Sequence, residues 1–344
     1  MHRILRGCRQ FTEETLTRSC RAGLIVAFTA LGHLATSLAA EAQQAGKLYR
    51  IGVLSHETPP PGIVELLRER LRELGYVEGK NVAFELRTAD GKNERLATLA
   101  EGLVQLNVDV ILAVHTPAAL AAKKATTKIP IVITRVADPV KSGLVPNLSH
   151  PGGNVTGLSF VPDELSGKRL QLLKEVIPGI TRAALLWSGD NPGATLVMKT
   201  MEAPAAQLGL RLVRVPVLGP SDFQGALQTA VRDGAEALII ADDALITRHR
   251  AQLVALATQH ALPVASLFPP IAEAGGLIAY GPSTPDMYRR AADFVDRILK
   301  GTKPGDLPIE QPTKFHLVVN LRAAKALRLT IPPSLLLQAD HVID

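Results

Sequence analysis

Short apolar segments rich in valine and isoleucine alternate with longer amphipathic segments along most of the chain. A short apolar run is typical of a buried strand, and apolar residues three or four apart are typical of a helix packed on a sheet. In the first half this pattern predicts strands at 50–55, 82–87, 108–114 and 129–133, with helices at 63–74, 93–106 and 117–125. The strand at 82–87 alternates apolar and polar residues, so it is expected nearer an edge. Strands joined by helices indicate a parallel, doubly wound sheet.

The same order of elements starts again after a segment dense in turn-forming residues, 149–158. In the second half the pattern predicts helices at 167–176, 194–208, 223–232 and 245–260, and strands at 182–187, 210–215, 237–241 and 263–267. The fold class expected is α/β, with two Rossmann-like, doubly wound parallel-sheet lobes.

Later segments exceed what two such sheets need, among them a helix at 285–300 and a strand at 315–319. The chain is therefore expected to cross back between the lobes and to form a hinge of several strands. The predicted boundaries are 48–157 plus 283–306 for the first lobe, and 158–282 plus 307–344 for the second.

The first 42 residues resemble a secretory signal rather than part of a fold. A basic stretch precedes an apolar run at 22–38, and small residues follow it up to Ala42. The alternative is a retained membrane anchor, although the run is short for spanning a bilayer. We expect a signal peptide at 1–42, export to the periplasm, and a mature chain without thiols, because Cys8 and Cys20 both lie in this segment.

Charge and composition exclude other classes of function. The net charge is +6, and the charged residues are scattered along the chain, with no basic run of the kind that binds nucleic acid. The sequence also has no nucleophile elbow, phosphate-binding loop, zinc-protease motif or dinucleotide fingerprint. We therefore expect no nucleic-acid partner, no catalytic residues, no cofactor and no enzymatic activity.

Ligands of open parallel sheets bind beyond the carboxyl ends of the strands. The residues that follow the predicted strands, together with a tyrosine in a later glycine-rich segment, give the candidate ligand contacts. These are Ser55, His56, His115, Thr116, Pro117, Ala118, Asp138, Asn191, Asp242, Phe268 and Tyr280.

Thr116 and Pro117 match the preferred first residues of a helix, with threonine as the N-cap. The free backbone N–H groups that follow, such as that of Ala118, would bind a ligand carboxylate. Asn191 and Pro192 repeat the arrangement in the second lobe. The alternative for both sites is ordinary helix capping.

The candidate acids Asp138 and Asp242 could receive an ammonium or hydroxyl group, or could start a turn or cap a helix, as Asp243 could. His56 and His115 follow strands of the first lobe and could hold a metal with a carboxylate. No His-rich tract or ligand-spaced pair supports this, so no metal is expected.

A series of motifs in a fixed order resembles a known family. The motifs are Gly75–Asn81 (GYVEGKN), Thr116–Ala122 (TPAALAA), Ile129–Val132 (IPIV), Asp138–Val140 (DPV), Pro151–Leu158 (PGGNVTGL), Glu273–Gly281 (EAGGLIAYG), Tyr288–Ala292 (YRRAA), Gln311–Phe315 (QPTKF), Asn320–Leu327 (NLRAAKAL) and Ile331–Leu335 (IPPSL). Together they resemble the ABC transporter substrate-binding proteins, in the group that includes tryptophan- and tyrosine-binding lipoproteins.

The resemblance implies a type I periplasmic binding fold that clamps a ligand between two lobes. It also implies a membrane permease and an ATPase as partners. Family members often have glycine where this chain has His115, and others have Asp-Pro-Leu where this chain has Asp242–Ala244. The lipoprotein signal of some members is missing here.

We therefore expect a monomeric periplasmic protein that captures an amino acid or related carboxylate for an ABC importer. A sensing role for a membrane receptor is an alternative that fits the same binding function. A transcriptional regulator would need a basic helix-turn-helix before the first sheet. An enzyme using the cleft carboxylates is the remaining alternative.

Overall fold

Five parallel strands form the first sheet of the computed structural model, which describes residues 47–58, 62–160, 164–241 and 243–344. They are β1 (Tyr49–Ser55), β2 (Val82–Thr88), β3 (Val110–Val114), β4 (Ile131–Val136) and β5 (Val155–Ser159), in the order β2-β1-β3-β4-β5. The predicted parallel sheet is confirmed, with β2 at an edge. β5 was not predicted and lies in the segment that the sequence marked as a turn.

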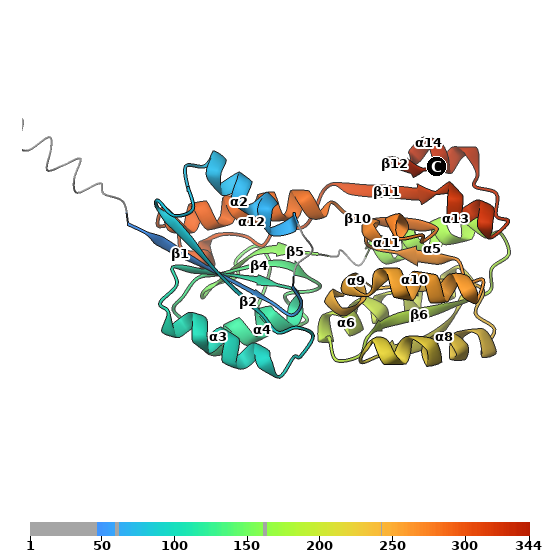
Figure 1. Cartoon of the computed structure of the whole chain (residues 1–344), viewed down its shortest axis with the longest axis horizontal. Helices are drawn as coiled ribbons and strands as arrows, with labels where there is room; N and C mark the ends of the chain where they lie inside the picture. The colour runs from blue at the N-terminus through green and yellow to red at the C-terminus, as the bar shows by residue number, and fades with distance from the viewer. Residues whose placement is uncertain (1–46, 59–61, 161–163, 242) are drawn as a thin grey trace, which may run out of the picture. The chain divides into compact units, whose positions relative to one another are not determined.

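Helices cover both faces of this sheet, with α3 and α4 on one face and α2 and α12 on the other (Figure 1). Their bounds are α2 (Ile63–Glu73), α3 (Arg95–Gln105), α4 (Thr116–Ala125) and α12 (Thr284–Leu299). Successive strand residues point to opposite faces. Thus Leu112 belongs to the core cluster that contains Leu67 of α2, while Ile111 belongs to the cluster that contains Leu103 of α3.

The second sheet has seven strands in the order β12-β11-β10-β9-β8-β6-β7. They are β6 (Arg182–Ser188), β7 (Arg211–Val217), β8 (Leu238–Ile240), β9 (Val264–Ser266), β10 (Ile278–Pro282), β11 (Phe315–Asn320) and β12 (His341–Ile343). All neighbours pair in parallel except β10 and β11, which pair antiparallel. The chain leaves β10 for the first lobe through α12, so β11 re-enters at the end where β10 left and runs back beside it.

The helices of the second lobe follow the predicted order with two interruptions. They are α5 (Glu164–Val176), α6 (Pro192–Thr200), α7 (Glu202–Gln207), α8 (Phe223–Arg232), α9 (Ala244–Arg248), α10 (Arg250–Gln259), α11 (Pro269–Glu273), α13 (Leu321–Ala326) and α14 (Pro333–Gln338), with a 3-10 turn η1 (Pro220–Asp222). The short helices α11 and α14 were not predicted. A second 3-10 turn, η2 (Pro304–Asp306), contacts β5 of the first sheet. The predicted helix 194–208 is split at Met201, because Pro204 has no N–H to donate to the carbonyl four residues earlier. The predicted helix 245–260 is split at His249.

Residues Tyr49–Asp344 form one compact unit in which the late helix α12 packs on the first lobe. The Tyr76 hydroxyl donates a buried hydrogen bond of 3.0 Å to Asp296 of α12. The later crossing at Glu310 pairs with β5 through two backbone hydrogen bonds of 2.9 Å, to Gly157 and Ser159. The exact division of residues between the lobes stays a prediction.

Within the described ranges, no helix is long and apolar enough to cross a membrane. The predicted signal segment, 1–42, lies outside the described residues.

Candidate functional site

The carboxyl ends of β1, β3 and β4 meet at a cavity of about 250 Å³. These strands are neighbours in the first sheet, so Ser55, His115 and Arg135 converge on one wall. The opposite wall comes from the second lobe, through Thr247 and Arg248 among others. The cavity is therefore a cleft between the two lobes, at the end of the sheet where the sequence predicted a ligand.

His115 has an unusual backbone conformation between β3 and α4. Its φ is +70° and its ψ is 161°, a region that essentially only glycine adopts without strain. The side chain is 6% exposed and lines the cavity. Among the described residues, neither ring nitrogen has a hydrogen-bond partner. Burial, the Arg135 charge and His56 hold the pKa of His115 well below its usual range.

This lowered pKa makes stability depend on pH. The unfolded chain takes up a proton on this side chain near pH 6.5, whereas the folded protein does not until a lower pH. We expect the free energy of unfolding to fall as the pH drops below about 6.5, by about 1.4 kcal/mol per pH unit from this one group. The loss should stop once the pH passes the folded pKa.

Urea unfolding between pH 8 and pH 5 measures this dependence, with His115→Ala as the control. Other titratable and charged groups that face the cavity are present in both proteins and cancel in the difference. Those that line the cavity are Glu57, Arg135, Arg248, Arg250 and Tyr288, and His56 acts on His115 without lining the cavity. Parallel stability curves for the two proteins would contradict the expectation.

Arg135 joins the two lobes through an aromatic contact. Its guanidinium lies 4.4 Å from the ring centroid of Phe268, which begins α11 in the second lobe, and 5.9 Å from that of Phe160. Such stacking on an aromatic face is favourable, more so when water is excluded, and Arg135 is 4% exposed. The predicted contact Phe268 thus packs against Arg135, which lines the cavity, and does not line the cavity itself.

The N-termini of α4 and α6 lie against each other across the lobes. A Cβ atom on Gly193 of α6 would come within 2.1 Å of the Thr116 hydroxyl oxygen of α4. The prediction that Thr116 is the N-cap of its helix is wrong. His115 occupies the N-cap position, and the Thr116 hydroxyl instead accepts a hydrogen bond of 3.3 Å from the Ala137 N–H. Pro117 and the fully buried Ala118 follow within the first turn of α4.

Asn191 caps α6 in the way the sequence suggested. Its side-chain oxygen accepts hydrogen bonds from the Gly193 and Ala194 N–H groups. Its amide also donates a buried hydrogen bond of 2.6 Å to Asp243, which in turn caps α9 through the Leu245 N–H. The two loops that follow β6 and β8 are therefore tied together beside the cleft.

Two polar contacts cross between the lobes outside the cavity centre. Arg248 of α9 pairs with the buried Glu57 carboxylate at 2.5 Å, and Asn93 donates a hydrogen bond of 2.7 Å to Asp190. Both contacts exist only when the lobes are together, so they stabilise the closed arrangement.

We expect Arg248→Met to weaken ligand binding, because Glu57 then stays buried without this partner when the lobes close. Arg248 is about half exposed, so the effect should be modest, about 1 kcal/mol or roughly fivefold in the dissociation constant. Isothermal titration calorimetry measures it. The double variant Glu57→Gln with Arg248→Met removes the buried charge and should recover part of the loss. Still weaker binding by the double variant would contradict the explanation.

Among the described residues, only Ser55 and His115 of the predicted contacts line the cavity, and the others lie beside it or away from it. Asp138 accepts hydrogen bonds from the N–H groups of Val140 and Lys141, so its carboxylate starts its own turn. Tyr280 lies in β10 against Phe315. His56 is buried next to the cavity with Nε2 unpartnered among the described residues, and Asp242 is outside them.

Several residues that line the cavity were not predicted, notably Arg135, Glu57 and Tyr288. A charged residue inside the apolar run Ile131–Val136 was a usable signal for Arg135. Tyr288 comes from α12, which reaches the cleft only through the return of the chain. In the described part of the chain, no group of three or more metal-binding side chains is present.

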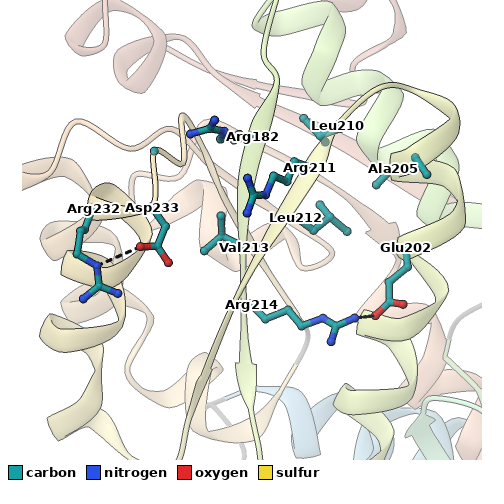
Figure 2. A pocket seen from close by; sticks show the side chains of 12 residues that line it. Arg182, Glu202, Ala205, Leu210, Arg211, Leu212, Val213, Arg214, Arg232 and Asp233 are labelled. Atoms are coloured by element: carbon teal, nitrogen blue, oxygen red, sulfur yellow. Dashed lines mark hydrogen bonds and ion pairs between the residues drawn. The ribbon is translucent and has the colours of Figure 1, made fainter.

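A larger hollow of about 820 Å³ lies at the opposite end of the second sheet, beside β7 (Figure 2). Arg211 and Arg214 extend from opposite sides of this edge strand, and Arg214 pairs with Glu202. Arginines and Pro216 along an edge strand discourage pairing with another chain. The hollow includes the amino ends of β6 and β7, the opposite end of these strands from the carboxyl ends that face the cleft.

Known proteins are similar to this chain in sequence and in fold. The family model described as ABC transporter substrate binding protein matches residues 53–343. A tyrosine-binding protein of Clostridioides difficile is 27% identical over 258 residues, which cover 75% of this chain and 74% of that protein.

Two solved structures are also similar, each with a TM-score of 0.81 and each covering 86% of this chain and 100% of its own. One is a conserved domain protein from Vibrio cholerae, 30% identical, and the other is an ABC domain from Streptococcus pneumonia in complex with L-Trp, 25% identical. The fold is that of the type I periplasmic binding proteins, as the resemblance implied. The chain belongs to the ABC transporter substrate binding protein family, whose members bind substrates rather than convert them.

Proposed function

We propose that this chain works in the periplasm, where it captures an amino acid or related carboxylate and delivers it to the permease and ATPase of an ABC importer. The observation that carries this proposal is the cavity of about 250 Å³ lined from both lobes. Ligand pockets of 300–1,000 Å³ suit drug-sized molecules, so a cavity of this size suits a small metabolite. A ligand that contacts both walls stabilises the closed form by its contacts with each lobe.

A carboxylate is the ligand group that the cleft favours. The first turn of α4 has no side-chain cap in the described structure, and its N–H groups carry the positive end of the helix dipole. The Arg135 guanidinium adds a positive charge on the same wall. We propose Ser55, His115, Thr116 and Ala118 as ligand contacts from the first lobe, with Asn191 and Asp242 from the second.

The relatives suggest which ligands to test first, since one is a tyrosine-binding protein and another is in complex with L-Trp. Native mass spectrometry of the purified protein would detect a compound that co-purifies with it. A thermal-shift screen with L-tyrosine, L-tryptophan, other amino acids and small carboxylates then measures stabilisation, because a ligand selective for the folded state raises the melting temperature.

We expect at least one amino acid or carboxylate to raise the melting temperature and to be recovered unchanged after incubation. Chemical conversion of the bound compound would instead support the alternative of an enzyme that uses the cleft carboxylates. A screen in which only cationic or uncharged compounds bind would contradict the proposed ligand class.

A further inference from the structure

The backbone of His115 is strained, and glycine in the same conformation would avoid this strain. Its φ of +70° and ψ of 161° would suit glycine, and this region strains the backbone of any residue that has a Cβ atom. Strained backbone of this kind clusters at active sites and ligand-binding sites, where the surrounding structure holds it in place. Glycine would avoid this strain, so histidine at this position indicates that the imidazole ring itself has a role.

The ring is placed to contact whatever occupies the cleft. It lines the cavity, is more than nine-tenths buried, and has both nitrogens without a hydrogen-bond partner among the described residues. Buried polar atoms normally have hydrogen-bond partners, and leaving one without a partner destabilises the protein. A ligand in the cavity would supply the missing partner.

The surroundings of the ring select the chemistry of that partner. Burial first, and then the Arg135 charge and His56, disfavour a proton on His115, so the imidazole is neutral and carries one N–H donor. An ammonium group placed here would meet the same positive charge. An oxygen acceptor, either a carboxylate or a hydroxyl oxygen, is the group that suits this position.

We infer that His115 is a specificity-determining residue that donates a hydrogen bond to an oxygen of the ligand, and that this contact selects which ligands the cleft accepts. The inference rests on the proposed binding function. It concerns a side chain at a position where the backbone conformation alone would favour glycine.

The test combines variants of His115 with a set of related ligands. His115→Ala removes the ring and keeps the strained backbone, whereas His115→Gly removes both. His56→Ala is the matched control, because His56 is also buried but is not among the residues that line the cavity. The probes are L-tyrosine and three compounds that each lack one of its polar groups. L-phenylalanine lacks the hydroxyl, tyramine lacks the carboxylate, and 3-(4-hydroxyphenyl)propionate lacks the ammonium group.

We expect His115→Ala and His115→Gly each to weaken L-tyrosine binding about tenfold or more by calorimetry, and His56→Ala to weaken it less. His115→Gly should melt a few degrees above His115→Ala, because it relieves the strain. The loss on removing the ring should persist with the propionate, which lacks only the ammonium group. The loss should disappear with phenylalanine if His115 contacts the hydroxyl oxygen of tyrosine, or with tyramine if His115 contacts the carboxylate.

Three results would overturn the inference. They are wild-type affinity in His115→Gly, a loss equal for all four probes, and a loss that disappears only with the probe that lacks the ammonium group. If none of the four probes binds the wild-type protein, the ligand is not a close relative of tyrosine, and the proposed binding function is decided by the wider thermal-shift screen. The role of His115 is then tested with the compound that co-purifies with the protein. If wild type and His115→Ala retain equal amounts of that compound, the inference is overturned.

Discussion

We expect Gly193→Ala to weaken ligand binding about fivefold or more while changing the stability of the folded lobes little. Gly193 lies in the first turn of α6, and an added Cβ would meet the Thr116 hydroxyl oxygen at 2.1 Å and the Thr116 Cβ at 2.8 Å. Thr116 belongs to the other lobe, so the clash with Thr116 exists only when the lobes close. An added Cβ would also lie 3.2 Å from Oδ1 of Asn191 in the same lobe, a tight contact that is present in both forms. Alanine is favourable in a helix, which offsets part of this cost, so we expect only a small change in the stability of the open form.

The size of the effect follows from the closed form alone. Overpacking of a tight contact typically costs about 1–3 kcal/mol, which corresponds to roughly 5- to 150-fold in the closing equilibrium. Calorimetry with a ligand from the thermal-shift screen measures the affinity, and small-angle scattering with and without ligand measures closure. Gly193→Val should show a larger loss, because its branched side chain reaches further across the interface.

Gly225→Ala is the matched control for this experiment. Gly225 lies in α8 with nothing within 4 Å of an added Cβ, so alanine there should leave binding unchanged. Wild-type binding by Gly193→Ala would show that this contact is not part of the ligand-bound form.

The alternation of apolar and amphipathic segments was sufficient to predict the α/β class, the parallel order and most strand positions. Buried parallel strands such as Val110–Val114 are almost wholly apolar, and this composition can be recognised locally. The convergence of Ser55 and His115 also followed, because the carboxyl ends of neighbouring parallel strands lie at one edge of a sheet.

Elements that depend on distant partners were not predicted. β5 contains Gly157 and follows a Pro-Gly-Gly turn, and it is a strand because β4 and the segment at Glu310 pair with it. The antiparallel pairing of β10 and β11 depends on the path of the chain through the other lobe. No local pattern contains that path.

The cleft shows the same division between local and distant causes. β4 was expected to end at Ile133, yet it continues to Val136 after an irregularity in which Arg135 has a φ of +56°. A left-handed arginine is uncommon, and its conformation depends on the tertiary structure around it. The Asn191 cap, in contrast, needs only its own helix and was anticipated correctly.

Gly157→Ala should lower the free energy of unfolding by at least about 3 kcal/mol, the sum of two separate penalties. The φ of Gly157 is +129°, a conformation that strains any residue with a Cβ. An added Cβ would also lie 2.3 Å from the Ile133 carbonyl oxygen and 2.6 Å from its nitrogen. These atoms belong to the backbone of the neighbouring strand β4, so they cannot move aside as a flexible side chain could.

Two other glycines separate the contributions in urea unfolding experiments. Gly102→Ala in α3 has an ordinary backbone and no close neighbour, so it should be neutral or stabilising by up to about 1 kcal/mol. Gly143→Ala has a φ of +76° and open space, so it should cost about 1 kcal/mol from strain alone. Gly157→Ala should exceed both because only this site adds a backbone collision. Equal losses for Gly143→Ala and Gly157→Ala would mean that β4 and β5 can separate at little cost, and that the close approach of the two strands is not needed for the fold.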